Sequence, residues 1–526
     1  MKKLILLLLA CSTGMAAVED ERVYVNPVIA GDYPDPTVIR VGDDYYAAAT
    51  SSDFAPNYPL FHSRDLVNWE RTGAVFDAPP PWVAGDCWAP ELFFNNGMYY
   101  VYYTARRKSD NVSCIGVAVT DDPRKGFTDR GVLVEWGSEA IDAFVFRDDD
   151  GSLYISWKAY GLDASRPIEL LASELTPDGL SLQGTHFSLT PHDRGWQGKG
   201  DEGHCIVKRD GYYYLFYSVG GCCDNRCDYR VEVARSKILK DGWVQYDENP
   251  ILQGGERWKC SGHGTVVQTP DGRYFYLYHA YHESDFEFVG RQCLLDEIRW
   301  DDDTHWPRFG NGGHPSLQAE MPVENTFQQR ETVFYDDFTS AEKEIYWLRD
   351  VNLPEPVIEK DGQGLKIAPS RPGICFRGVN PQTGSYVAET FVLNKGENFK
   401  GLCVYGNRVN LFAWGLENGR IELYKLMDGN KTVLFSQATD ASGIYLRVTS
   451  VDGRYFHVQW SPDREEWHAY PETGSLDGHF LPQWGKGVRC GLMVAADRAD
   501  DAGIFSFFRM ESRFTPPRAY LPEAGS

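Results

Sequence analysis

The chain is poor in basic residues, in long apolar stretches and in helical periodicity. It contains 52 Lys and Arg against 75 Asp and Glu, which gives a formal net charge of −23 at pH 7. Such a surface repels phosphate backbones and anionic lipids, so we expect neither nucleic-acid nor membrane partners. After the N-terminal leader no stretch is apolar and long enough to cross a bilayer. No segment shows a sustained helical period either, and the chain is therefore predicted to be all-β.

The first residues resemble a secretory signal. Lys2 and Lys3 precede a short apolar run, and small residues follow up to Ala17. We expect residues 1–17 to be a signal peptide and the protein to be exported, to the periplasm or the cell surface. The segment that ends at Cys11 also resembles a bacterial lipoprotein cleavage site, so a lipid anchor at Cys11 is the alternative to free secretion.

Cysteines are the next guide to the environment of the chain. Twelve are present, and the eleven after Cys11 are an odd number, so in an exported protein at least one must stay unpaired. Cys222, Cys223 and Cys227 lie close together and suggest a disulfide staple in a loop. A zinc site is the alternative, although zinc needs about four ligands. The neighbours Cys222 and Cys223 cannot both pair with Cys227.

One phrase occurs five times in the first 280 residues: a carboxylate or histidine, a short apolar strand, a glycine turn and an aromatic-rich strand. The leading residues are Asp35, Glu91, Asp142, Glu202 and His263, and the turn glycines are Gly42, Gly97, Gly151, Gly211 and Gly272, about 55 to 60 residues apart. Repeats of this period predict a β-propeller with one blade per repeat, here five blades over residues 23–315. The first strand of a blade lines the central axis, so the leading polar residues are expected to converge there.

The remainder of the chain has a different pattern. Residues 316–332 follow a glycine- and proline-rich stretch and are typical of a linker. From residue 333 to 515, short alternating strands without the earlier repeat predict a β-sandwich, of the concanavalin-like type. The tail, 516–526, is expected to lie outside both domains.

Three of the converging acids suggest a reaction. Glycosidic bonds are cleaved by a pair of carboxyl groups, of which one protonates the leaving oxygen and the other activates water or attacks carbon. Asp35, Asp142 and Glu202 can supply a base, a group that tunes a pKa and an acid. Glu91 is a fourth candidate, but the nearby Trp88 is better placed to face a ligand. The alternative is a propeller that only binds carbohydrate, which needs aromatic platforms and no cluster of acids.

An ordered set of motifs carries a family resemblance. The segments Tyr33-Pro-Asp-Pro, Trp88-Ala-Pro-Glu91, Ile141-Asp-Ala143, Asp201-Glu-Gly203 and Gly262-His-Gly occur in this order. Together they resemble glycoside hydrolase family 43 over roughly residues 24 to 310. The C-terminal part resembles the β-sandwich that follows the propeller in the β-xylosidases and arabinofuranosidases of that family.

The resemblance implies a role for each candidate residue. Family members work by inversion on a five-bladed propeller, and no organic cofactor is expected. The implied roles are general base for Asp35, pKa modulator for Asp142, general acid for Glu202, walls of the sugar pocket for Trp88 and Phe54, contact with sugar hydroxyls for Arg291, and proximity to a water-coordinated cation, often calcium, for His263.

Two positions depart from the family pattern. His204 stands where the family often has proline, and Gln292 stands where it often has glutamate. These departures concern the choice of substrate. A retaining fructan hydrolase, which shares the fold, is disfavoured because Asp35 follows Tyr-Pro and no Arg-Asp-Pro motif occurs.

The expected function is an exo-acting, inverting glycosidase. It would release terminal α-L-arabinofuranose or β-D-xylose from plant cell-wall polysaccharide fragments, and its partners would be oligo- and polysaccharides that contain these sugars. We favour arabinose slightly over xylose because of the exported context, and β-xylosidase activity is the alternative.

Overall fold

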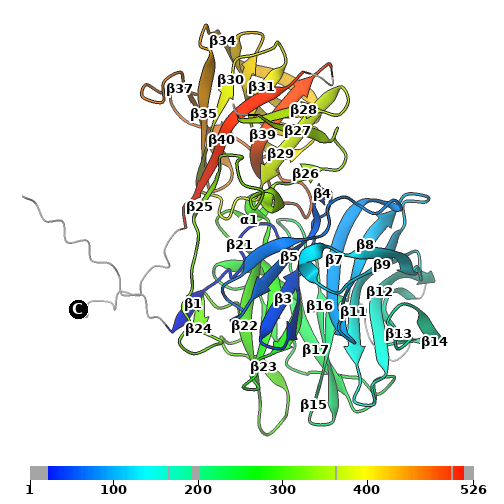
Figure 1. The fold of residues 1–526 in the computed structure, drawn as a ribbon. Helices are drawn as coiled ribbons and strands as arrows, with labels where there is room; N and C mark the ends of the chain where they lie inside the picture. Colours follow the sequence, from blue (N-terminus) through cyan, green and yellow to red (C-terminus); the bar gives the residue numbers. More distant parts are fainter. Residues whose placement is uncertain (1–21, 164–165, 191–200, 362–363, 499–500, 515–526) are drawn as a thin grey trace, which may run out of the picture.

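The computed structural model describes residues 22–163, 166–190, 201–361, 364–498 and 501–514, and consists almost wholly of β-strands (Figure 1). The predicted signal peptide, 1–17, and the predicted tail, 516–526, lie outside the described residues. Within those residues, helical structure is confined to α1 (Phe286–Val289) and the 3-10 turns η1 (Pro123–Lys125) and η3 (Glu344–Tyr346). None of the described helices has the length and apolar character needed to cross a membrane. The prediction of an all-β chain is confirmed.

The first part of the chain folds into five consecutive antiparallel sheets. In spatial order their strands are β2 (Thr37–Val41), β3 (Asp44–Ala48), β5 (Asn57–Ser63) and β6 (Glu70–Phe76); β7 (Val83–Asn95), β8 (Met98–Arg107), β9 (Ser113–Thr120) and β10 (Thr128–Val134); β11 (Glu139–Arg147), β12 (Leu153–Asp163), β13 (Arg166–Leu175) and β14 (Leu182–Ser188); β15 (Glu202–Arg209), β16 (Tyr212–Val219) and β17 (Arg230–Ser236), with β18 (Val244–Gln245) and β19 (Leu252–Gln253) both on β17; and β20 (Trp258–Gln268), β21 (Tyr274–His282), β22 (Arg291–Trp300) and β23 (Pro307–Phe309).

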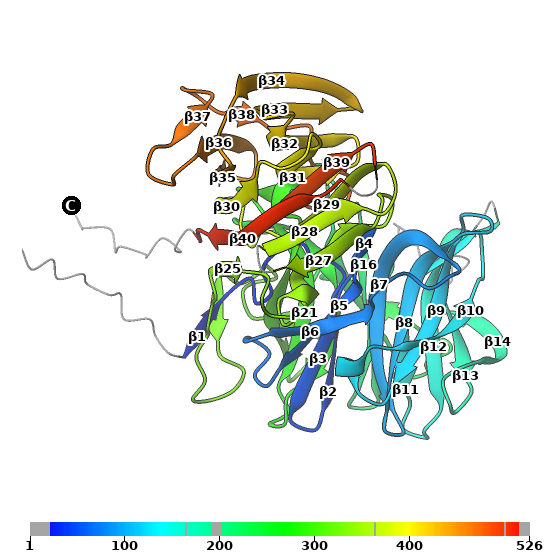
Figure 2. The ribbon, with the colours of Figure 1, turned by 45° about the horizontal axis from the view of Figure 1, so that its top comes forward.

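The first strands of the five sheets contact one another in cyclic order. β2 contacts β7, β7 contacts β11, β11 contacts β15, β15 contacts β20, and β20 contacts β2 again. Buried aromatic and aliphatic side chains fill the space between neighbouring sheets, as in the cluster that joins Phe216 of β16 to Tyr276 of β21. The leading residues Glu91, Asp142, Glu202 and His263 therefore stand on strands that meet at the centre of this ring, and Asp35 lies two residues before β2. Figure 2 shows this first part of the chain below the second part.

The predicted glycine turns connect the first two strands of each sheet. All five turn glycines have positive φ, from 65° at Gly42 to 89° at Gly272. Glycine adopts this conformation without the steric cost that a Cβ atom would add, so these residues set tight hairpins at the five places.

The second part of the chain forms two sheets packed face to face. One contains, in spatial order, β27 (Pro356–Asp361), β28 (Gly364–Pro369), β40 (Gly503–Ser512), β30 (Tyr386–Leu393), β35 (Gly443–Val451), β36 (Tyr455–Ser461) and β37 (His468–Tyr470), with β25 (Val333–Asp336) on β40 and β38 (Leu476–Asp477) on β36. The other contains β29 (Gly373–Val379), β39 (Arg489–Ala496), β31 (Phe399–Asn407), β32 (Asn410–Glu417), β33 (Arg420–Met427) and β34 (Asn430–Ala438). A single apolar cluster, which includes Leu402, Trp414 and Phe508, lies between them.

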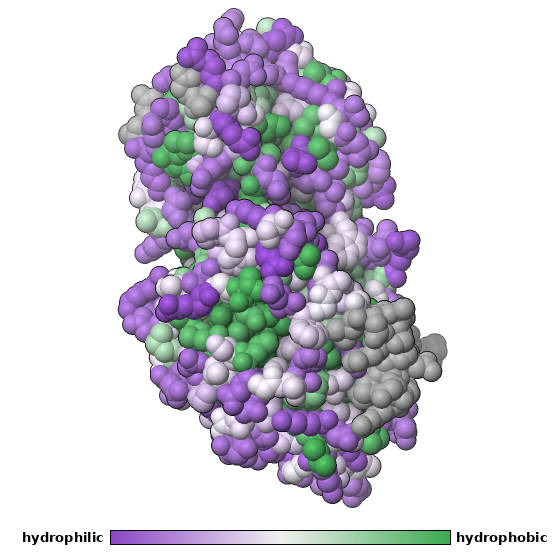
Figure 3. Space-filling view, turned by 90° about the vertical axis from the view of Figure 1, so that its right-hand side faces the viewer, coloured by the Kyte–Doolittle hydropathy of each residue, from purple (hydrophilic) through white to green (hydrophobic). Residues whose placement is uncertain are grey.

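One short strand pair holds residues 316–332, the connecting segment, against the first part, and another joins the two parts. The segment predicted to be only a linker, 316–332, contains β24 (Gln318–Glu320), which pairs with β1 (Val23–Val25). The short strand β4 (Phe54–Ala55) of the first part pairs with β26 (Arg349–Asp350) of the second. Hydrophilic side chains cover most of the face in Figure 3, and apolar surface gathers mainly on its lower part.

A buried ion pair holds the second part against the first. Arg489 of β39 donates from Nη2 to Oδ2 of Asp32 at 2.8 Å, and its guanidinium lies 3.9 Å from the ring centroid of Phe54. Both charged residues are buried, at 3% and 5% exposure. Oδ2 of Asp32 also accepts a hydrogen bond from the amide N–H of Gly487, and Oδ1 accepts one from the amide N–H of Arg291. The carboxylate is therefore hydrogen-bonded to the backbone of both parts.

Replacing Arg489 by Met is expected to destabilise the protein markedly. The change leaves the Asp32 carboxylate buried without its cation, which costs about 3 kcal/mol or more. Thermal unfolding followed by circular dichroism should show a clearly lower Tm. Arg454→Met is the matched control, because Arg454 and its partner Asp477 are both 43% exposed and such pairs add little stability. Equal Tm values for the two variants would contradict this account of the interface.

Two disulfides are present among the described cysteines, at the loop where the sequence suggested a staple. Cys222 pairs with its neighbour Cys223, and Cys227 pairs with Cys260 on β20. The other described cysteines, Cys87, Cys114, Cys205, Cys293, Cys375, Cys403 and Cys490, are buried free thiols. The second disulfide ties the loop before β17, in which Tyr229 lies, to the first strand of the fifth sheet.

Candidate active site

Backbone irregularities aim the leading polar residues into the centre of the ring. Asp142 and His263 have φ of 57° and 43°, and the strand register shifts at both positions. Asp35, two residues before β2, has a φ of 55°, and Gly203, directly after Glu202, has a φ of 53°. Bulges of this kind re-aim side chains and are typical of functional sites.

Side chains from the preceding sheet hold these irregular positions. The amide N–H of Asp142 donates to Oγ1 of Thr104 at 3.0 Å, and that of His263 donates to Oγ of Ser218 at 2.8 Å. The amide N–H of Asp35 donates to Nδ1 of His279 at 3.0 Å, which links the last sheet to the first. The acids are therefore positioned by the packing of neighbouring sheets, and this makes the cluster rigid.

Asp35 is a buried carboxylate surrounded by donors. Arg291 donates from Nη1 to Oδ1 at 2.8 Å, and Thr50 donates from Oγ1 to Oδ2 at 2.7 Å. Nδ1 of His263 lies 3.4 Å from Oδ1. Burial alone would raise the pKa of Asp35, but Arg291 and His263 outweigh it and hold the pKa well below its usual range. Asp35 is therefore ionised throughout the neutral range, as a general base requires.

Asp142 has the opposite tendency. Burial, together with the negative charges of Glu202 and Asp35, raises its pKa to about 6, although His263 works against the shift. Its Oδ2 accepts the amide N–H of Gly203 at 3.3 Å and lies 3.8 Å from Nδ1 of His263. The contrast between Asp35 and Asp142 is the electrostatic signature of a site that handles protons.

Glu202 stands on the first strand of the fourth sheet and is held at both oxygens. Lys158 of β12 donates from Nζ to Oε2, and Tyr229 donates from its hydroxyl to Oε1 at 2.8 Å. Burial would raise the pKa of Glu202, but the ion pair with Lys158 lowers it. Since Asp142 and Glu202 interact, their titrations are coupled and belong to the pair of carboxyl groups.

The other predicted residues divide into two groups. Arg291 joins the cluster through Asp35. Trp88 is half-buried on β7, opposite Thr104, whose hydroxyl oxygen accepts the amide N–H of Asp142, and the guanidinium of Arg106 lies 5.4 Å from its ring centroid. The structure does not support the prediction that Phe54 forms a wall of the sugar pocket. Its ring is 2% exposed and packs against Tyr405 of the second part, so it offers almost no surface to a sugar and instead braces the interface.

Three further polar residues near the cluster form hydrogen bonds within the fold, although Nδ1 of His204 has no partner among the described residues. Glu91 is buried, accepts a hydrogen bond from Oγ1 of Thr37 at 2.7 Å, and has a pKa raised by burial to about 8. His204 is buried and lies 2.7 Å from Oγ of Ser156, with a pKa lowered by burial to about 3. Gln292 is buried and accepts the amide N–H of Gly31 at 3.4 Å. Both departures from the family pattern are thus accommodated by packing.

Sequence reasoning missed Lys158, Tyr229 and His279. Lys158 and His279 are charged or polar residues within otherwise apolar strands, and this was an available signal. Tyr229 is one of 30 tyrosines and carried none. In the structure its ring stacks on that of His279, with centroids 5.7 Å apart.

The predicted calcium near His263 stays a prediction. Among the described residues, no three His, Cys, Asp or Glu side chains gather as a metal-binding group. Calcium prefers six to eight oxygen ligands, and Nδ1 of His263 faces the carboxylates of Asp35 and Asp142. These side chains do not form a protein-ligated calcium site, and we assign no step to a metal.

Comparisons with known proteins agree with this geometry. The model of the family described as Glycosyl hydrolases family 43 matches residues 24–307. A protein named xylosidase/arabinosidase from Butyrivibrio fibrisolvens is 27% identical over 460 residues, which cover 76% of this chain and 86% of that protein. The extracellular exo-alpha-(1->5)-L-arabinofuranosidase ArbA of Cellvibrio japonicus is 28% identical over 53% of this chain and 86% of its own length.

A solved structure extends the likeness to both parts of the fold. The crystal structure of xylan beta-1,4-xylosidase from Bacillus halodurans C-125 superposes with a TM-score of 0.79 at 20% identity, and covers 93% of this chain and all of the other. At this identity the match shows the fold alone.

Proposed function

The chain belongs to glycosyl hydrolase family 43, and from this premise we propose that it releases terminal α-L-arabinofuranose, with β-D-xylose as the alternative sugar, from plant cell-wall polysaccharide fragments. The protein is a glycosidase. The observation that carries the proposal is the buried cluster of three carboxyl groups, in which Asp35 is held ionised while Asp142 takes a raised pKa.

The architecture in this proposal is a five-bladed propeller over residues 23–315, followed by a β-sandwich over 333–515. The cyclic contacts of β2, β7, β11, β15 and β20 support one blade per sheet. The protein acts outside the cytoplasm, as the relative labelled extracellular does.

Action at a chain end is supported by a loop of the sandwich. The amide N–H of Gly485 donates to the carbonyl oxygen of Cys223 at 3.0 Å, and Lys486 forms an ion pair with Asp53. A Cβ atom on Gly485 would stand 3.8 Å from Nη2 of Arg291, so the loop approaches the residue that holds Asp35. In our proposal this loop closes one side of the pocket, which leaves room for one terminal sugar.

The proposed mechanism assigns one proton transfer to each catalytic residue. Asp35 takes a proton from a water molecule as that water attacks the anomeric carbon, and Glu202 gives a proton to the departing glycosidic oxygen. The bond from the anomeric carbon to the leaving oxygen breaks as the bond to the water oxygen forms, so the configuration inverts.

Glu202 must be protonated to act, whereas in the ligand-free site Lys158 lowers its pKa. In our proposal the leaving oxygen of the bound sugar loosens the ion pair between Glu202 and Lys158, and the negative charge of Asp142 then raises the pKa of Glu202 so that it holds a proton. Lys158 and Tyr229 then act as positioning residues, because each reaches the reaction only through Glu202.

Replacing Lys158 by Met is expected to move the alkaline limb of the pH profile of kcat/KM to higher pH. The acid works when protonated, and removal of the cation raises the pKa of Glu202, so more of the acid stays protonated as the pH rises. Lys208→Met is the control, because Lys208 pairs with Asp148 in a hairpin and should leave the limb in place. If the alkaline limb of the kcat/KM profile of Lys158→Met lies at the same or a lower pH than in the wild type, Glu202 is not the acid that Lys158 positions.

Hydrolysis of 4-nitrophenyl α-L-arabinofuranoside and 4-nitrophenyl β-D-xylopyranoside tests the proposed substrate. We expect the arabinofuranoside to be cleaved with the higher kcat/KM. Preference for the xylopyranoside would establish the alternative, a β-xylosidase. If the protein cleaves neither nitrophenyl glycoside and also fails to cleave arabino- and xylo-oligosaccharides, both proposed activities are refuted.

A further inference from the structure

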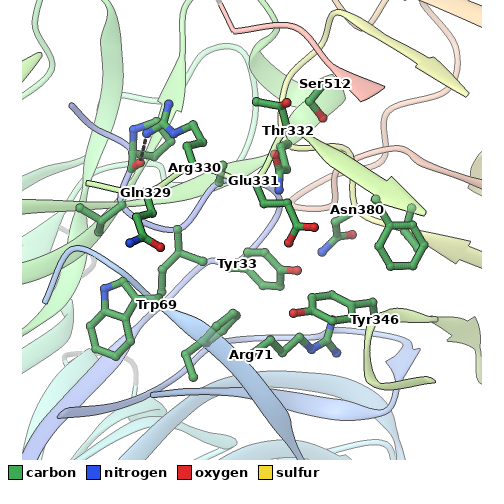
Figure 4. A pocket seen from close by; sticks show the side chains of 18 of the residues that line it. Tyr33, Trp69, Arg71, Gln329, Arg330, Glu331, Thr332, Tyr346, Asn380 and Ser512 are labelled. Atoms are coloured by element: carbon green, nitrogen blue, oxygen red, sulfur yellow. Dashed lines mark hydrogen bonds between the residues drawn. The ribbon is translucent and has the colours of Figure 1, made fainter. Parts of the chain in front are cut away.

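A second cavity lies at the junction of the two parts of the fold, away from the acid cluster. It has a volume of about 200 Å³, and neither the three acids nor Arg291 line it. Its walls come from three places: Trp69 and Arg71 from the first sheet, Gln329 and Glu331 from the connecting segment, and Tyr346 and Asn380 from the second part (Figure 4).

The connecting segment is fixed over this cavity. The amide N–H of Gln329 donates to Oδ1 of Asn68 at 2.6 Å, and Gln328 donates from Nε2 to the carbonyl oxygen of Val25 at 3.0 Å. Nη2 of Arg330 donates to the carbonyl oxygen of Pro27 at 2.8 Å. The cavity is therefore already formed in the ligand-free protein.

The unpaired nitrogen atoms of Arg71 are the main indication that this cavity binds a ligand. The residue is 4% exposed, yet its Nε and Nη2 atoms have no hydrogen-bond partner among the described residues. Its guanidinium lies 5.7 Å from the ring centroid of Tyr346 and points into the cavity (Figure 4). A buried charge without acceptors is costly, so proteins seldom keep one without a partner.

Hydrogen-bond acceptors without a donor line the same cavity. Oδ1 of Asn380 and Oε1 of Gln382 are buried and have no partner in the described structure, while Nδ2 of Asn380 is held by the carbonyl oxygen of Asp32 at 3.2 Å. The Glu331 carboxylate faces the cavity as well (Figure 4). A ligand must therefore accept from Arg71 and donate to oxygen atoms.

These requirements discriminate between ligand classes. A simple anion would satisfy Arg71 but would face the carboxylate of Glu331 and two amide oxygens. A sugar hydroxyl both accepts and donates. The rings of Tyr33, Trp69 and Tyr346 supply the aromatic walls against which the C–H faces of a sugar pack.

We propose that this cavity is a second saccharide-binding site, which takes one neutral sugar unit of an oligosaccharide and is separate from the site of hydrolysis. It can hold a branch or a second chain of the polysaccharide while the acid cluster acts on a chain end. The proposal concerns binding only and involves no bond change.

Calorimetric titration of the Glu202→Gln variant with arabinotriose and xylotriose tests the proposal. The variant slows turnover by about 100-fold or more, so binding is measured with little hydrolysis during the titration. We expect two binding events per chain with at least one of the two sugars, and loss of one event when Arg71→Met is added. Arg64→Met, at an arginine whose side chain is 76% exposed, is the matched control and should keep both events. A single event that Arg71→Met leaves unchanged would overturn the proposal and indicate a cavity filled by water.

Two further measurements distinguish a ligand-binding role of Arg71 from a purely structural one. Without sugar, Arg71→Met should have a Tm equal to or above that of the parent, because it removes an uncompensated buried charge. A lower Tm would indicate that the Arg71 guanidinium finds its hydrogen-bond partners within the fold and would contradict the proposal.

Glu331→Ala, at an exposed position, should weaken the affinity of the second binding event by about tenfold, the cost of a hydrogen bond to a charged group. Unchanged affinity in that variant would also count against the site.

Discussion

Glu202→Gln is expected to lower kcat on arabino- or xylo-oligosaccharides by about 100- to 10,000-fold, the usual contribution of a general acid. The amide keeps the shape of the side chain and its contact with Tyr229, but it has no proton to give to the leaving oxygen. The loss should be smaller on a 4-nitrophenyl glycoside, because nitrophenolate departs with little need for protonation. Steady-state kinetics on the two kinds of substrate measure the difference.

Glu91→Gln is the matched control for this variant. Glu91 stands on the first strand of the second sheet and is 4% exposed, and its raised pKa of about 8 keeps it largely neutral at pH 7. An amide mimics a neutral carboxyl group, so kcat should change little. A comparable loss in Glu91→Gln, or an equal loss of Glu202→Gln on both kinds of substrate, would show that Glu202 is not the acid.

Asp35→Asn is expected to lower kcat by about 100- to 10,000-fold as well, and by the same factor on oligosaccharides and nitrophenyl glycosides. A better leaving group does not compensate for a water molecule that cannot be deprotonated. The pKa of Asp35 is held well below its usual range, so in the wild type its ionisation should not limit the rate between pH 5 and 8. Dependence of the Asp35→Asn loss on the leaving group would contradict its role as base.

The same variant should be less stable. A carboxylate whose pKa is depressed on folding contributes stability above its unfolded pKa of about 3.9, and this contribution is lost as the pH falls. In Asp35→Asn the buried cation of Arg291 also loses its partner. Asp296→Asn is the control for folding, since Asp296 is buried to a similar degree but bonds to Tyr278 outside the cluster. It should leave kcat near the wild-type value.

The sequence predicted the strands, the turns and the convergence of acids because these rest on local signals. An apolar strand that follows a polar residue, with glycine at the hairpin, specifies where one side chain must point, and Asp35 and Asp142 each lie within 4 Å of His263. Their opposite pKa shifts could not be predicted, because these depend on burial in the assembled ring and on charges from distant strands, such as Arg291 beside Asp35 and Glu202 beside Asp142.

Phe54 shows where sequence reasoning reached its limit. The residue follows the first hairpin, close to the predicted pocket, but its ring packs against Tyr405 and Arg489, more than 300 positions further along the chain. No local pattern encodes that contact. The cavity around Arg71 escaped prediction for the same reason, since its walls come from three separate segments.

The configuration of the first sugar released tests the central claim most directly. Proton NMR of the anomeric signal during the first minutes of hydrolysis distinguishes the two stereochemical outcomes before mutarotation mixes them. If Asp35 activates water while Glu202 protonates the leaving oxygen, an α-L-arabinofuranoside must first yield β-L-arabinofuranose, and a β-D-xyloside must first yield α-D-xylose. Release of the sugar with its original configuration would require a covalent intermediate on the enzyme and would contradict the roles of Asp35 as base and Glu202 as acid.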